Sequence, residues 1–138
     1  MLSNGQVTHY FEISKRQISN IFNDLFFFFF FKVYLAVFLV LNISLWLAAM
    51  YIRKAINEPM IALHYNVDFG IDYHGSADKL FILPILGLTF FLVNVVLFSI
   101  VRNQKDRKFI GHILCAVAVL ANLILLAGIA SVYLINFR

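Results

Sequence analysis

The sequence predicts an all-α membrane protein with three transmembrane helices and a short β-like segment between the first two. Three blocks without Asp, Glu, Lys or Arg carry this prediction, at residues 33–52, 80–101 and 109–135. A helix needs about 20 apolar residues to cross the hydrocarbon core of a bilayer. The composition agrees, because 62% of the residues are apolar and only 13% are charged. We therefore interpret residues 1–138 as a single membrane domain.

Residues 1–25 form an amphipathic segment ahead of the first span. Ile18, Ile21, Phe22 and Leu25 recur at helical spacing. This pattern predicts a helix that lies along the headgroup boundary, and a cytoplasmic helix on a partner protein is the alternative. The segment lacks the basic start and short apolar stretch of a cleavable signal peptide.

The six phenylalanines at residues 26–31 point all round a helix, so we interpret them as a run tolerated by lipid.

Residues 55–78 form the one sizeable extramembrane segment. Large apolar or aromatic residues alternate without a break with small or polar residues from Ile61 to His74, which is the period of a β-strand. The run exceeds the usual strand length of about 5–6 residues, and Gly70 suits a bend or a turn. The sequence leaves two alternatives, one bent strand or a short hairpin that turns near Phe69 and Gly70.

The distribution of basic residues predicts the orientation. Positively charged residues near the ends of spans are enriched on the cytoplasmic side. One side has seven of them and the other has four: Lys15, Arg16, Lys32, Arg102, Lys105, Arg107 and Lys108 against Arg53, Lys54, Lys79 and Arg138. We therefore expect a multi-pass protein of the cell membrane with a cytoplasmic amino terminus, an outer carboxyl terminus and an outer 55–78 segment.

Polar and small residues inside the apolar blocks predict interhelical packing. Each block contains one asparagine near its middle, and amides in hydrocarbon are commonly paired between helices. A polar conduit is the less favoured alternative, since no ionisable residue accompanies the amides. Small residues on one face of the third block let helices approach closely. The residues predicted to pack between helices are Asn42, Asn94, Asn122, Gly111, Cys115 and Ala118.

The outer segment contains the candidate functional residues. Histidine and carboxylate side chains together can bind a transition metal, and one set of the alternating pattern supplies His64, Asp68, Asp72 and His74. On a straight strand these residues lie too far apart to share an ion, so only a hairpin near Gly70 could bring them together. The alternative is a solvated polar face, with Tyr65, Phe69 and Tyr73 packed on the membrane surface or on a partner.

Part of this segment resembles a recurrent pattern in uncharacterised small bacterial multi-span membrane proteins. The pattern is L-H-Y-N-x-x-F-G-[IV]-D between the first two spans, followed by F-x-x-P-x-x-G. Its matching residues here are Leu63, His64, Tyr65, Asn66, Phe69, Gly70 and Asp72, and then Phe81, Pro84 and Gly87. The resemblance implies a shared architecture and no particular activity.

Taken together, these patterns favour a structural or interaction subunit that uses residues 61–74. The alternative function is a metal- or solute-binding site at the outer surface. We find no nucleophile–base pair and no phosphate- or dinucleotide-binding loop, so we expect no enzyme, no catalytic residue and no cofactor. The expected partners are the lipid bilayer and another protein or a second copy of the chain. The basic residues flank the spans, so we expect no nucleic acid.

Overall fold

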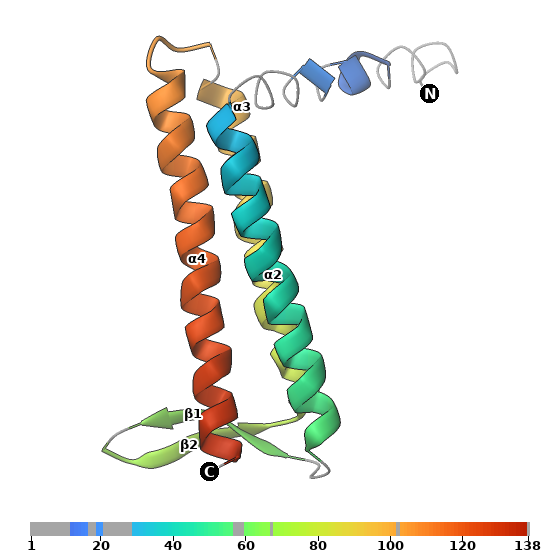
Figure 1. The fold of residues 1–138 in the computed structure, drawn as a ribbon, viewed down its shortest axis with the longest axis vertical. Helices are drawn as coiled ribbons and strands as arrows, with labels where there is room; N and C mark the ends of the chain where they lie inside the picture. Colours follow the sequence, from blue (N-terminus) through green and yellow to red (C-terminus); the bar gives the residue numbers. More distant parts are fainter. Residues whose placement is uncertain are drawn as a thin grey trace, which may run out of the picture.

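Three long helices run side by side, and a β-hairpin lies across one end of them (Figure 1). The structure is a computed structural model that describes residues 12–16, 19–20, 29–56, 60–66, 68–101 and 103–137. Its elements are α2 (Phe29–Ala55), β1 (Ile61–Asn66), β2 (Gly70–Gly75), the 3-10 helix η1 (Ala77–Phe81), α3 (Ile82–Val101) and α4 (Arg107–Asn136). Of the predicted amphipathic segment, residues 12–16 and 19–20 are helical, and the rest lies outside the described residues.

The three helices are long and apolar enough to cross a membrane, over Phe29–Ala55, Ala77–Val101 and Arg107–Asn136. Each extends beyond the apolar block that predicted it, because helical hydrogen bonding continues past the hydrocarbon edge. Long basic side chains at the ends can reach the headgroups. Arg53 and Lys54 in the last turn of α2 also interact favourably with the helix dipole.

Pro84 is the third residue of α3. Proline is tolerated in the first turn of an α-helix, because its fixed φ is compatible with helix there. The preceding turn is the 3-10 helix η1, and Ser76 stands at its N-cap without a side-chain hydrogen bond. The second span therefore begins as a tight turn and becomes regular α-helix at Ile82.

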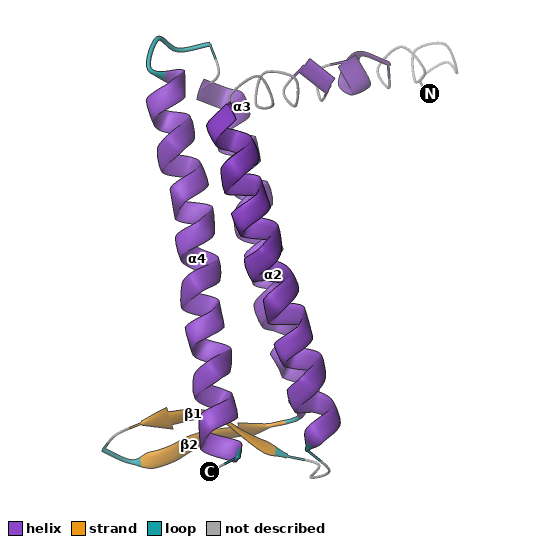
Figure 2. Ribbon diagram, in the orientation of Figure 1, coloured by secondary structure: helices purple, strands orange, loops and turns teal. Residues whose placement is uncertain are grey.

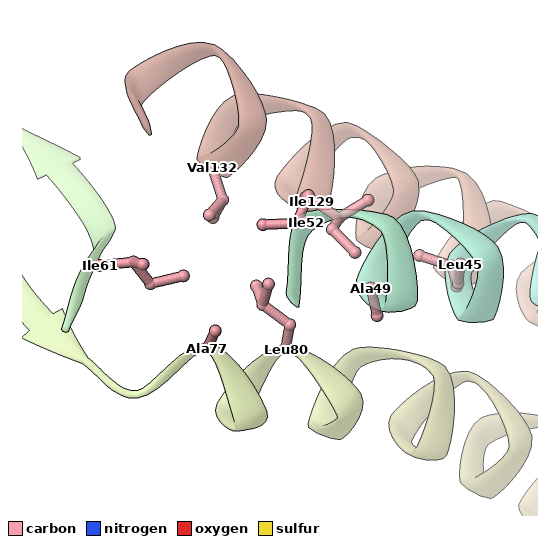
Figure 3. Packing of buried hydrophobic residues seen from close by; sticks show 8 residues of the cluster. All are labelled: Leu45, Ala49, Ile52, Ile61, Ala77, Leu80, Ile129 and Val132. Carbon is pink, nitrogen blue, oxygen red and sulfur yellow. The ribbon is translucent and has the colours of Figure 1, made fainter. Parts of the chain in front are cut away.

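α4 is the central element, because it packs extensively against both α2 and α3. Figure 2 shows the same arrangement, with the two strands forming the one sheet among the described residues. A buried apolar cluster at the hairpin end joins α2, β1, η1 and α4 (Figure 3); its members are Leu45, Ala49, Ile52, Ile61, Ala77, Leu80, Ile129 and Val132. A second cluster around Phe31 and Phe98 lies towards the other end.

Candidate functional site

The alternating segment is a hairpin rather than one bent strand. β1 and β2 pair antiparallel, from Ile61 opposite Gly75 to Asn66 opposite Gly70. Gly70 has a φ of +76°, a left-handed conformation that glycine adopts without steric cost. The turn also has an internal hydrogen bond, since the Asn66 Oδ1 accepts from the Asp68 backbone N–H at 2.9 Å. Val67 lies outside the described residues.

Two irregularities interrupt the ladder. Ala62 is opposite His74 and His64 is opposite Tyr73, so Leu63 is one residue too many on β1. Tyr65 is opposite Ile71, so Asp72 is one residue too many on β2. A bulge of this kind breaks the alternation of side chains and bends the strand. The polar set expected from the sequence is therefore not one continuous face.

Asn136 of α4 binds the hairpin to the helices through hydrogen bonds to the backbone of β1. Its side-chain amide donates to the Ala62 carbonyl at 2.8 Å and accepts from the Ala62 N–H at 3.0 Å. It also donates to the Val132 carbonyl of its own helix at 2.8 Å. The amide thus takes the place that a peptide group of a third strand would occupy on β1. Beside it, Ile61 is only 2% exposed and packs into the apolar cluster (Figure 3).

Sequence reasoning missed this role of Asn136. The one available signal was its position as the first polar residue after the third apolar block. Nothing in the pattern identifies Ala62, 74 residues earlier in the chain, as its partner.

The hairpin brings together only two of the four candidate metal ligands. The His64 Nδ1 lies 2.6 Å from the Asp72 Oδ1. The turn explains this contact, because Asn66 is opposite Gly70 and Tyr65 is opposite Ile71, so the next position on each strand is His64 and Asp72. Asp68 and His74 do not join them, and no group of three or more His, Cys, Asp or Glu side chains suited to a metal occurs among the described residues. Of the four candidate ligands, the hairpin therefore leaves one His–Asp pair.

The outer part of the hairpin exposes apolar and aromatic side chains. Tyr65 is 50% exposed, Phe69 83%, Ile71 44% and Tyr73 48%. The turn that carries Phe69 projects beyond α4 (Figure 1). The base of the hairpin is thus buried against the helices, while its outer part presents an apolar surface. We call these four residues the hairpin surface.

Two grooves lie under the hairpin. One, with a volume of about 450 Å³, is bounded by β1 and the last turns of α4, and includes His64 and Ser131. The other, of about 300 Å³, lies between the hairpin, α4 and the start of α3, and includes Lys79. Leu63, Gly128 and Val132 belong to both grooves.

The buried amides divide into one interhelical pair and one separate residue. The Asn42 Nδ2 donates to the Asn122 Oδ1 at 3.2 Å and to the Pro84 carbonyl at 3.1 Å, so it links all three helices. The Asn122 Nδ2 donates to the Ala118 carbonyl at 3.0 Å. Asn94 instead donates to the Phe90 carbonyl of its own helix at 2.8 Å, and so does not join the pair.

Gly87 makes this amide pair possible. A Cβ atom at Gly87 would lie 2.5 Å from the Asn122 Oδ1 and 2.7 Å from the Asn42 Nδ2. Pro84 and Gly87, the last two defined residues of the F-x-x-P-x-x-G pattern, therefore supply the acceptor and the space for the interhelical amides.

The small residues of α4 lie at the helix contacts or beside them. Gly111 and Ala118 are buried, and a Cβ at Gly111 would lie 3.2 Å from the Phe98 ring of α3. Cys115 is half-buried and packs against the cluster around Phe31 and Phe98.

No protein-family model, curated protein or solved structure matches this chain. The resemblance to small bacterial membrane proteins stays a prediction from the sequence.

Proposed function

We propose that this chain is a multi-pass protein of the cell membrane that works as a structural or interaction subunit. The hairpin surface is the part that binds, and the partner is another protein or a second copy of the chain. The role is not enzymatic. The observation that carries this proposal is the exposure of Tyr65, Phe69, Ile71 and Tyr73 on an anchored hairpin.

Anchoring at the base supports this role. An isolated two-stranded hairpin is marginally stable, whereas this one has Ile61 in the apolar cluster and two hydrogen bonds from Asn136 to Ala62. A surface held in place before binding loses less conformational entropy when a partner docks. Aromatic side chains are also enriched at the energetic centres of protein interfaces.

Strand addition is the mode that the backbone favours. An unpaired strand edge recruits another strand, and alternate side chains then provide specificity. α4 and Asn136 cover part of the β1 edge. β2 pairs with β1 and, among the described residues, with no further strand. We therefore place the incoming strand at the free edge of β2.

The proposed orientation puts the hairpin on the outer face. Arg53 and Lys54 are the basic residues that most weaken this orientation, because they lie at the end of the first span on the hairpin side. The Arg53 Nε lies 2.5 Å from the Asp78 Oδ1, so its positive charge has a local counter-charge. The orientation itself is supported by the seven basic residues on the amino-terminal side against four on the hairpin side.

Site-specific photocrosslinking in intact cells tests the interaction. A photoreactive phenylalanine analogue at Phe69 should give a discrete adduct. The same analogue at Met60, which is 57% exposed at the base of the hairpin, is the matched control and should give little. Changing Tyr73→Ser and Ile71→Ser together should remove the Phe69 adduct while the protein still inserts. Equal labelling from Met60 and Phe69, unaffected by these changes, would contradict the proposal.

A metal- or solute-binding function is the second candidate, and the His64–Asp72 contact at 2.6 Å favours it. The pair borders the larger groove. The substitutions His64→Gln and Asp72→Asn separate the two functions. Under the interaction proposal they leave the Phe69 adduct intact. If they abolish binding of zinc by the purified protein and also abolish function, the second candidate replaces the first.

A further inference from the structure

The two grooves beneath the hairpin meet at Gly128. A Cβ atom built on Gly128 would have no atom within 4 Å, so this residue leaves open space on α4 where any other side chain would project. The walls are mostly apolar, with Leu63 and Val132 common to both grooves. Their volumes, about 450 and about 300 Å³, lie in the range of small-ligand pockets.

The positively charged side chain of Lys79 lies at the edge of the smaller groove. The Lys79 Nζ lies 2.5 Å from the Tyr73 hydroxyl and 4.9 Å from the centre of its ring. The neighbouring carboxylate, Asp78, is paired with Arg53. Within the part of the chain that the structure describes, Lys79 therefore has no anionic partner.

The smaller groove lies between helices that are candidate membrane spans. Two candidate membrane spans border the groove: one consists of η1 and α3, and the other is α4. The groove lies at the ends of these spans, under the hairpin. In the membrane arrangement proposed above, the apolar walls face acyl chains and Lys79 lies at the depth of the headgroups. Phospholipids place an anionic phosphate directly above an acyl chain, and a lysine near such a surface contributes to binding them.

We propose that the joined groove binds one anionic phospholipid from the leaflet on the hairpin side. An acyl chain lies over Gly128, beneath Leu63, and the phosphate interacts with Lys79. Gly128 and Lys79 border the same groove whichever side of the membrane the hairpin occupies and whether or not a protein partner is bound.

Native mass spectrometry of the purified protein in mild detergent tests the site, with phosphatidylglycerol and phosphatidylcholine as probes. The wild type should bind one phosphatidylglycerol in preference to phosphatidylcholine. The series Gly128→Ala, Gly128→Leu and Gly128→Phe should weaken binding of both lipids progressively as the side chain fills the groove. Lys79→Gln should lower affinity for phosphatidylglycerol by about fivefold and leave phosphatidylcholine unchanged.

Ala127→Leu is the matched control, because Ala127 is an exposed neighbour on α4 and is absent from the walls of both grooves. It should bind lipid as the wild type does. Thermal unfolding checks that each Gly128 variant folds; if Gly128→Phe does not, Gly128→Ala and Gly128→Leu still test the groove. Wild-type binding by a folded Gly128→Leu protein would overturn the proposal. So would displacement of the lipid by equimolar inorganic phosphate, since the site would then recognise a free anion.

Discussion

At the residue scale, the buried amides explain how three apolar helices acquire a defined register. Lipid and helix surfaces are similarly apolar, so close packing and hydrogen bonds must distinguish one arrangement from others. Asn42 supplies both hydrogen bonds that cross between helices at this level, one to Asn122 and one to the Pro84 carbonyl. Gly87 lies against both amides. The positions of Asn42, Asn122, Pro84 and Gly87 therefore depend on one another, and we call these four residues the amide unit.

Substitution of Gly87 tests that unit. We expect Gly87→Ala to separate the amides, because its Cβ would lie 2.5 Å from the Asn122 Oδ1. The expected cost is about 1–3 kcal/mol of unfolding free energy, as for other overpacked sites. Gly128→Ala is the control, since its Cβ has open space, and should change stability little. Equal effects of the two substitutions, measured by denaturant titration in detergent micelles, would show that the amides do not require Gly87.

The asparagines themselves should differ in their effect on stability. Asn42→Leu removes two interhelical hydrogen bonds and should cost up to about 2 kcal/mol while membrane insertion persists. Asn94→Leu removes one bond within α3 and should cost clearly less. The comparison uses the same denaturant titration. A complete loss of a transport activity in Asn42→Leu at unchanged stability would instead favour the polar conduit.

At the scale of the elements, the hairpin is shaped by its two bulges and by its attachment to α4. The bulges turn Leu63 and Asp72 out of the regular alternation. Leu63 packs against the apolar cluster, and Asp72 remains in contact with His64, the residue that a regular register from the turn would place opposite it. Strict alternation correctly indicated strand, but it did not indicate which side chains share a face.

Hydrogen exchange at the Ala62 backbone amide measures how firmly Asn136 holds β1 on α4. We expect Asn136→Leu to release β1, because the Ala62 N–H and carbonyl lose their partners on α4. Each such hydrogen bond contributes about 1 kcal/mol net, so the Ala62 amide should exchange with deuterium about tenfold faster or more. Amides in the middle of α4 serve as the internal control. Unchanged exchange at Ala62 would mean that the strand pairing alone holds this residue.

At the scale of the whole molecule, three helices leave most of their apolar surface exposed. The described spans bury 28%, 17% and 17% of the residues in their most apolar windows, so the greater part of each helix is available to lipid or to partner helices. Since α4 contacts both other helices, the bundle depends on it, and all three helices still expose apolar faces.

Cysteine labelling determines the orientation of the whole molecule. In a Cys115→Ala background, Phe69→Cys should react with an impermeant reagent added to intact cells, because the distribution of basic residues predicts that the hairpin lies outside. Gln104→Cys, in the exposed linker between α3 and α4, should react only after the cells are opened. The opposite pattern would invert the topology. Phe69 is preferred to Ala62 as a reporter, since Ala62 is only 6% exposed.

The sequence alone determined the membrane spans and the strand character of the outer segment. Both depend on local composition and period: a continuous apolar block satisfies lipid wherever its neighbours lie, and an alternating run suits a strand. The sequence left open whether the strand turned back on itself, and it did not identify which polar residues meet. Asn42 and Asn122 are 80 positions apart, and Ala62 and Asn136 are 74 apart. Only tertiary structure decided these pairs, because which amides meet depends on how far each helix extends and on which faces pack together.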